Sequence, residues 1–249
     1  MDRKDLIQLK SQPKIISSYS IVGKKEHDGP LGRLFDEHSS DTRFGQKTWE
    51  LAESEMQKRA LSGAIAKSGI SADEIGVIFA GDLQNQCAAS SYGLMDFNLP
   101  YIGLYGACST LGEGMIVASI FIDSANIKSA AVISSSHFCT AERQFRFPLP
   151  YGNQRQPIAQ RTVTGAAAYI LSSVGNGPKI TEILPGRIVD KGISDANNMG
   201  AAMAPAAADT LYRFFIQSGT SPKDYDAIVT GDLATEGEGL LGNYCQKKE

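Results

Sequence analysis

Two similar stretches carry most of the information about the fold: Ser71-Ala-Asp-Glu-Ile-Gly-Val-Ile-Phe-Ala-Gly-Asp-Leu83 and Ser221-Pro-Lys-Asp-Tyr-Asp-Ala-Ile-Val-Thr-Gly-Asp-Leu233. Each stretch begins with a short acidic turn, continues into an apolar run typical of a buried strand, and ends in the triplet Gly-Asp-Leu. The triplet alone is a weak signal, but here its strand context is repeated with it. The pattern therefore predicts a duplicated α/β unit, with a chance similarity of two strand ends as the alternative.

The sequence on either side of the repeat alternates between strand-like and helix-like segments. We expect strands at residues 14–22, 75–80, 100–105, 129–135, 162–171, 179–189 and 225–230. We expect helices at 46–67, 88–96, 110–126 and 205–218, the last with Pro205 in its first turn. This alternation predicts an α/β fold with mostly buried strands. The repeat divides the chain into a first half, 1–175, which contains an Arg-rich loop at 140–160, and a partial second half, 176–249.

The composition is that of a globular protein without a polyanionic partner. Of the 249 residues, 42% are hydrophobic and 20% charged, and the formal net charge is −3, so no basic surface for nucleic acid is indicated. We find neither an apolar stretch of signal-peptide length at the N-terminus nor a run of the ~18 apolar residues expected of a spanning helix. The four cysteines are widely spaced, which argues against zinc knuckles and disulfides and predicts a reducing, cytoplasmic location.

A cysteine follows the third predicted strand, in Tyr101-Ile-Gly-Leu-Tyr-Gly-Ala-Cys-Ser-Thr110. The pattern places Cys108 and Ser109 on a tight turn between this strand and the next helix. A helix N-terminus stabilises negative charge, so this turn suits either a reactive thiolate or a bound carboxylate. The alternative is a buried structural cysteine, which is a common use of free Cys.

Polar residues also follow two other predicted strands. Asp82 and Asn85 come after the strand at 75–80, and His137 after the strand at 129–135. Ligands in open α/β folds bind at the carboxyl ends of the strands, so these side chains are candidates for the same site. The alternatives are a turn or N-cap role for Asp82 and a satisfied structural role for His137.

The loop that begins near residue 140 combines arginines with aromatic residues and prolines. Arg143 and Arg146 could each clamp a carboxylate through two parallel hydrogen bonds. They stand beside Glu142, so an internal ion pair on a solvated loop is an equally weighted alternative.

Several of these segments together resemble one protein family. They are Asp28–Asp36, Ala80–Gln86, Gly106–Thr110, Thr140–Arg146, Thr162–Gly165 and Gly200–Thr210. The longer motifs, Ala-Glu-Arg-Gln-Phe-Arg and Met-Ala-Pro-Ala-Ala-Ala-Asp-Thr, are specific, and the chain is similar to the stage V sporulation protein AD family. The resemblance implies a thiolase-like duplicated α/β fold with mixed sheets and layered helices. Family members continue beyond the region matched here, so we expect the second half to be incomplete.

The resemblance also implies a function. Family members bind dipicolinic acid (pyridine-2,6-dicarboxylate) during its uptake into the developing spore, alongside other proteins of the stage V sporulation A membrane transport system. This implies a cytoplasmic protein peripheral to the inner membrane of the forespore or spore, with no metal or cofactor, calcium left open as a co-ligand, and homodimerisation possible for this fold. The candidate ligand-binding residues are Asp82, Asn85, Cys108, Ser109, His137, Glu142, Arg143 and Arg146.

Two other functions remain open. Cys108 corresponds to the nucleophile of acyl-thioester condensing enzymes of this fold, with His137 as an improvised base, but the partners that such enzymes draw from the second half are missing. We therefore do not expect an enzyme. The third possibility is a purely structural subunit of a membrane complex.

Overall fold

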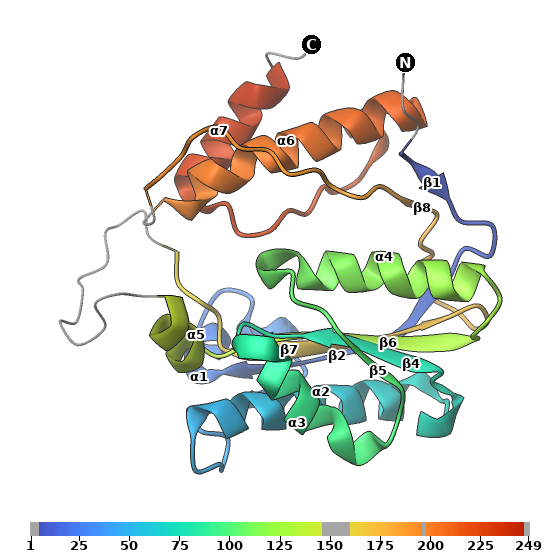
Figure 1. Cartoon of the computed structure of the whole chain (residues 1–249), viewed down its shortest axis with the longest axis vertical. Coiled ribbons are helices and arrows are strands. Elements are labelled where there is room, and N and C mark those ends of the chain that lie inside the picture. The colour runs from blue at the N-terminus through green and yellow to red at the C-terminus, as the bar shows by residue number, and fades with distance from the viewer. Residues whose placement is uncertain (1–4, 146–159, 196–197, 247–249) are drawn as a thin grey trace. The chain divides into compact units, whose positions relative to one another are not determined.

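The chain forms two compact units, described by a computed structural model over residues 5–145, 160–195 and 198–246 (Figure 1). The larger, here called the sheet unit, comprises Leu9–Leu149 and Thr162–Thr181. The smaller, here called the helical unit, comprises Met1–Gln8, Pro150–Arg161 and Glu182–Glu249. These boundaries follow contacts, whereas the division expected at residues 175 and 176 follows the sequence repeat and stays a prediction.

A six-stranded mixed sheet forms the centre of the sheet unit, in the order β3-β2-β7-β6-β4-β5. β7 runs antiparallel to β2 and β6, while β4 pairs in parallel with β5 and β6 and β2 in parallel with β3. The strands are β2 (Lys14–Gly23), β3 (Glu37–Ser39), β4 (Val77–Gly81), β5 (Tyr101–Gly103), β6 (Ser129–Ser136) and β7 (Gly165–Ser172). Five of the seven predicted strands are thus confirmed.

Helices cover both faces of this sheet (Figure 1). α2 (Trp49–Ser68) and α3 (Ala88–Leu94) lie on one face, and α4 (Thr110–Asp123) on the other. Short helices α1 (Lys24–His27) and α5 (Phe138–Phe145) follow β2 and β6. All three helices predicted in this unit are confirmed.

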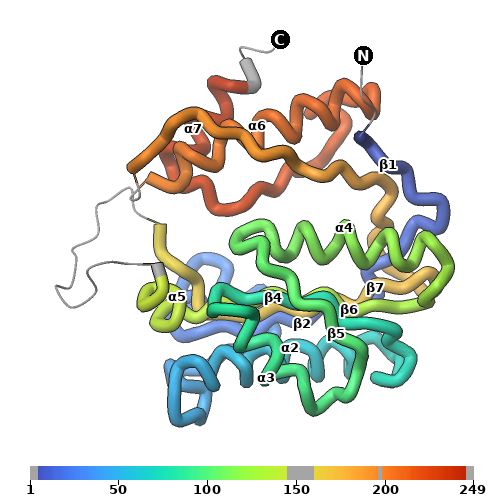
Figure 2. The backbone as a smooth tube through the Cα atoms, viewed as in Figure 1, coloured from blue at the N-terminus to red at the C-terminus, as the bar shows by residue number. Residues whose placement is uncertain are grey.

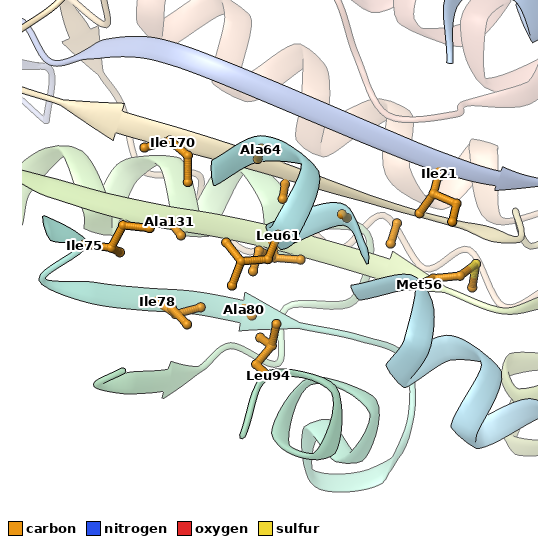
Figure 3. Packing of buried hydrophobic residues seen from close by; sticks show 14 of the residues in the cluster. Ile21, Met56, Leu61, Ala64, Ile75, Ile78, Ala80, Leu94, Ala131 and Ile170 are labelled. Carbon is orange, nitrogen blue, oxygen red and sulfur yellow. The ribbon is translucent and has the colours of Figure 1, made fainter. Parts of the chain in front are cut away.

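The buried strand β4 shows why both faces are covered. Side chains alternate along a strand, so Ile78 and Ala80 enter the apolar cluster beneath α2, shown in Figure 3, whereas Val77 and Phe79 enter the cluster beneath α4. All of β4 is buried. A continuous apolar run is what a strand covered on both sides requires.

The helical unit contains α6 (Met199–Ser218) packed against α7 (Ala234–Gln246), as Figure 2 shows, and a two-stranded antiparallel ladder of β1 (Ile7–Gln8) and β8 (Glu182–Ile183). α6 begins at Met199, six residues before the predicted start, and its N-cap residue Asn198 accepts a side-chain hydrogen bond from Ala201 N–H. Pro205 therefore lies inside the helix rather than in its first turn. The strand expected at 179–189 is reduced to β8, apart from an isolated bridge between Lys14 and Lys179.

The two copies of the repeat share their beginning and end but not their strand. Each follows a helix that ends at a left-handed glycine, Gly69 or Gly219, and each opens with a Ser-capped 3₁₀ turn, Ala72–Glu74 or Pro222–Asp224.

In each copy the aspartate of Gly-Asp-Leu accepts a hydrogen bond from the N–H two residues later, at 2.9 Å. The strand expected at 225–230 is nevertheless wrong, because these residues pair with no strand in the described part of the chain.

Candidate functional site

The carboxyl ends of three strands meet at one edge of the sheet unit. β4, β5 and β6 are parallel, so the loops that follow them emerge on the same side. Gly81, the last residue of β4, sits against the loop that follows β5: a Cβ there would lie 2.1 Å from Leu104 O and 2.7 Å from Thr110 Cγ2. Only glycine permits this approach, which brings the Asp82 loop and the Cys108 turn together.

The Cys108 turn is a 3₁₀ turn, Ala107–Ser109, that leads directly into α4, as predicted. Cys108 and Ser109 are exposed, and Ser109 Oγ donates a hydrogen bond to Gly106 O at 2.7 Å. Thr110, the first residue of α4, is only 3% exposed, and among the described residues its hydroxyl has no hydrogen-bond partner. The turn thus combines an accessible thiol with a buried hydroxyl that lacks a partner.

The other described cysteines are less accessible. Cys87 is buried and its Sγ donates to Leu104 O at 3.1 Å, while Cys139 is partly buried. Burial is the main cause that raises the pKa of both thiols. Of the cysteines that the structure describes, Cys108 is the exposed one.

Beneath this edge lies a closed circuit of hydrogen bonds, which we call the strand-end ring. Its members come from α2, from the loop after β4, from α3 and from β6, and they are Glu53, Gln57, Asp82, Gln84, Ser90 and Ser135.

Asp82 accepts from Gln84 N–H at 2.9 Å, from Ser90 N–H at 2.8 Å and from Ser90 Oγ at 2.6 Å. These contacts match the turn role that the sequence offered as an alternative for Asp82. The residue is only 2% exposed.

Glu53 is the second carboxylate of the strand-end ring and is fully buried. It accepts from Gln84 Nε2 and Ser135 Oγ, both at 2.9 Å, and from Thr140 Oγ1 at 2.8 Å. Burial raises the pKa of Glu53 to about 7; these hydrogen bonds oppose the shift, and the charge of Asp82 adds to it. The amide of Gln57 closes the circuit, donating to Ser90 Oγ at 2.8 Å and to Ser135 Oγ at 2.7 Å.

His137 is buried and engaged at both ring nitrogens. Nε2 lies 2.8 Å from Thr42 O, to which it donates in the tautomer where Nδ1 accepts from Cys139 N–H at 3.1 Å. Burial lowers the pKa of His137 and so favours the neutral ring. These contacts fit the satisfied structural role; acting as a base would require the ring to leave Thr42.

Glu142 and Arg143, the two candidate residues in α5, differ in their exposure and in their partners. Arg143 is exposed and forms an ion pair with Glu50, not with Glu142. Its guanidinium lies 5.8 Å from the ring centroid of Trp49, which Arg43 also approaches, at 5.6 Å.

Glu142 is buried, and its Oε1 accepts from Thr162 Oγ1 at 3.3 Å. Asn85 is exposed, and Arg146 lies outside the described residues.

The sequence interpretation missed most of the strand-end ring. One signal was available: Glu53 and Gln57 stand four residues apart in the buried stripe of α2 that also contains Met56 and Ala60. Two polar residues at helical spacing in such a stripe indicate a buried network. Ser90 and Ser135 carry no comparable local signal.

Within the described parts of the chain, no group of three or more His, Cys, Asp or Glu side chains is arranged to hold a metal ion. No helix described here has the length and apolar character needed to cross a bilayer.

The backbone is similar to those of several solved structures. A variant of Xanthomonas campestris OleA superposes with a TM-score of 0.65 at 14% identity, covering 96% of this chain and 82% of its own. The 3-oxoacyl-(acyl carrier protein) synthase III of Xanthomonas oryzae pv. oryzae gives 0.66 at 14% identity, over 96% and 83%. The Aquifex aeolicus synthase III gives 0.65 at 13% identity, over 94% and 81%. At such identities the likeness shows the fold alone, and the predicted thiolase-like α/β fold is confirmed.

Sequence relatives are more specific. The sequence profile of stage V sporulation protein AD matches residues 3–249. The stage V sporulation protein AD of Bacillus subtilis (strain 168) is 41% identical over 225 residues, which is 90% of this chain and 67% of that protein. Together these matches show that the chain belongs to the stage V sporulation protein AD family.

Proposed function

We propose that this chain binds dipicolinic acid at the strand-end edge of the sheet unit and supports its uptake into the developing spore. Family membership makes dipicolinate the ligand to test. The observation that carries the proposed location is the first turn of α4, where exposed Cys108 and Ser109 adjoin the buried hydroxyl of Thr110 that lacks a partner among the described residues.

The chemistry of this turn suits a carboxylate. Helix N-termini present N–H groups without partners in the helix and carry partial positive charge. The N–H groups of Ser109 and Thr110 already donate within the 3₁₀ turn, to Gly106 O and Ala107 O. A carboxylate bound there would accept from the hydroxyl of Thr110 and interact with the partial positive charge of the helix start. The loop that contains Asn85 is held beside the turn by the Cys87–Leu104 hydrogen bond, so its exposed amide can serve the same ligand.

The candidate residues then divide by position. Asn85, Cys108, Ser109 and Arg143 are exposed and are proposed to contact the ligand, whereas Asp82, His137 and Glu142 are buried and are proposed to support the loops. Arg143 must exchange Glu50 for a ligand carboxylate in order to contribute.

The decisive experiment is calorimetric titration of dipicolinate, with pyridine-2-carboxylate as a matched ligand that lacks one carboxylate. Thr110→Val removes the hydroxyl but keeps the shape, and should weaken binding about ten-fold, the effect of one hydrogen bond. Because it removes a buried unsatisfied group, it should not lower the melting temperature. Unchanged affinity in this variant would place the ligand elsewhere.

Arg143 is tested by two variants that act in opposite directions. Arg143→Ala should weaken dipicolinate binding by about 1.5–3 kcal/mol, as for a charge-assisted hydrogen bond. Glu50→Gln, which frees the guanidinium from its partner, should strengthen it. If neither variant changes the affinity, Arg143 is outside the site.

The second candidate function is acyl transfer through Cys108, favoured by the exposure of this thiol at the start of α4. Incubation with an acyl-CoA followed by intact-mass measurement tests it. Acylation that is lost in Cys108→Ser favours the enzyme; an unmodified mass together with dipicolinate binding favours the binding protein.

The proposed setting is the inner membrane of the forespore or spore, where the chain would work with other proteins of the stage V sporulation A system. Co-purification with those proteins tests this. If the chain binds those proteins but binds dipicolinate neither in the presence nor in the absence of calcium, its role is only structural.

A further inference from the structure

The strand-end ring buries two carboxylates, and among the residues that the structure describes no cationic side chain pairs with either. Glu53 is 0% and Asp82 2% exposed, and all six hydrogen bonds that they accept come from amide or hydroxyl groups. Two adjacent buried carboxylates repel each other, and burial penalises charge, so such a pair favours binding a proton.

The groups that face Glu53 can be named element by element. The loop after β4 contributes Gln84 and the carboxylate of Asp82, β6 contributes Ser135, and α5 contributes Thr140. On its own helix, Gln57 lies one turn away and Glu50 pairs with Arg143.

Charged and titratable groups on the neighbouring elements are engaged elsewhere. On β2, Lys14 donates to Ser173 O and Tyr19 to Glu37, while Tyr169 of β7 belongs to the cluster beneath α4. Around Asp82, the pKa values of Cys87 and Tyr101 are raised, mainly by burial. Among the described residues, therefore, no cation neutralises the two carboxylates.

The hydrogen bonds of Glu53 can rearrange around a proton, and those of Asp82 cannot do so as readily. Two of the three donors to Asp82 are fixed backbone N–H groups. Glu53 instead accepts from two rotatable hydroxyls. Thr140 Oγ1 also lies 2.9 Å from His137 O, so its proton can turn to that carbonyl while its oxygen accepts from a protonated Glu53. Proton uptake at Glu53 then keeps the hydrogen bond between Glu53 and Thr140, with its direction reversed.

We propose that Glu53 takes up a proton when a dicarboxylate binds at this edge, so that ligand binding is proton-linked. The inference rests on the proposed function, and Glu53 acts as a positioning residue beneath the ligand rather than as a contact. An incoming dianion adds negative charge beside the ring, which strengthens proton binding at Glu53. By reciprocity, protonation of Glu53 strengthens anion binding. The pKa of about 7 places this exchange near neutral pH.

The test is titration calorimetry of dipicolinate on the full chain at pH 7, in buffers of different ionisation enthalpy. The dependence of the observed enthalpy on the buffer gives the number of protons taken up. We expect net uptake in the wild type, with affinity at pH 6 at least about five-fold higher than at pH 8. In Glu53→Gln both effects should disappear. Glu55→Gln is the matched control, since it removes a partly exposed carboxylate of the same helix that pairs with Arg59, and it should behave as the wild type.

Each failure has a distinct meaning. Binding without proton uptake in the wild type overturns the linkage and leaves the proposed function intact, whereas no binding at any pH overturns both. Equal proton uptake in the wild type and Glu53→Gln assigns the proton to another group. If Glu53→Gln does not fold, ¹³C NMR of the glutamate carboxyls in the wild type replaces this variant. The proposal requires a glutamate that titrates near pH 7 and whose pKa rises when dipicolinate is added. A pKa that does not change on addition of dipicolinate contradicts the proposal.

Discussion

At the scale of single residues, burial decides which of the candidate side chains can do chemistry. Cys108 and Cys87 are separated by 21 positions and lie around the same edge, yet one is exposed and the other is hydrogen-bonded inside. Glu53 and His137 are both buried, and burial shifts their pKa values in opposite directions because it disfavours the charged form of each.

Cys108 should react with iodoacetamide near neutral pH faster than Cys87 and Cys139. It is exposed at a helix start, whereas burial raises the pKa of the other two thiols and so reduces their thiolate fraction. Peptide mass spectrometry after brief alkylation gives the order. Slower alkylation of Cys108 would show that the α4 turn protects its sulfur.

Glu53 should make the sheet unit less stable as the pH rises. Its pKa is raised from 4.5 to about 7 on folding, so between these values the folded state holds a proton that the unfolded state has lost. The contribution of Glu53 to the free energy of unfolding therefore falls by roughly 3 kcal/mol between about pH 4.5 and about pH 7, and stays constant at higher pH.

Urea unfolding of the wild type and Glu53→Gln across this range checks the sign. The quantity to compare is the change of the unfolding free energy with pH in the two proteins. The unfolding free energy itself is not informative here, because the glutamine amide alters the strand-end ring at every pH. His137, whose pKa is lowered, contributes the opposite slope below its unfolded value near 6.5 in both proteins and so cancels. Parallel pH profiles would show that Glu53 titrates normally.

At the scale of elements, glycines set how closely helices and strands approach. Gly93 of α3 faces the backbone of α2, where an added Cβ would lie 2.4 Å from Ser54 O. Gly112 of α4 has nothing within 4 Å of the corresponding position. The same substitution at the two sites therefore separates packing from helix propensity.

Gly93→Ala should destabilise the sheet unit by about 1–3 kcal/mol, because α2 and α3 must move apart. Gly112→Ala should stabilise it by about 0.5–1 kcal/mol through helix propensity alone. Thermal unfolding of both variants measures the difference. Equal effects would mean that α3 is not held against α2 as described.

At the scale of the whole molecule, the two copies of the repeat have different surroundings. In the first, β4 is paired on both sides and buried. In the second, residues 225–230 form no strand, and Ile228 and Val229 are 43% and 90% exposed. An unpaired apolar segment of high strand propensity is a site for intermolecular pairing.

The chain should therefore self-associate with rising concentration. Val229→Lys should reduce this self-association, because it places a charge on the exposed segment 225–230. Val174→Lys is the matched control, since Val174 is also exposed, at 64%, but lies in a turn of the sheet unit. Light scattering at several concentrations, with thermal unfolding alongside, measures both. A monodisperse wild-type monomer would show that residues 225–230 do not pair with another copy of the chain.

The sequence by itself determined what depends on local patterns. The apolar runs and helical periods predicted five strands and the long helices of the sheet unit, because hydrophobic spacing reflects which faces are covered. The repeat predicted the short acidic turn that opens each copy, and a turn role for Asp82 was one of the two alternatives. The turn at Cys108 was predicted from small residues between a strand and a helix, and the family from its long motifs.

Only the tertiary structure decided what depends on residues distant in the chain. Glu53, Asp82 and Ser135 form one network because α2 packs across the ends of β4 and β6, a proximity that no local pattern encodes. The same holds for the burial of His137 against Thr42 and for the pairing of Arg143 with Glu50. The second copy of the strand pattern is the clearest case. Residues 225–230 contain an apolar run, as β4 does, but a strand is stable only when neighbours satisfy its backbone hydrogen bonds.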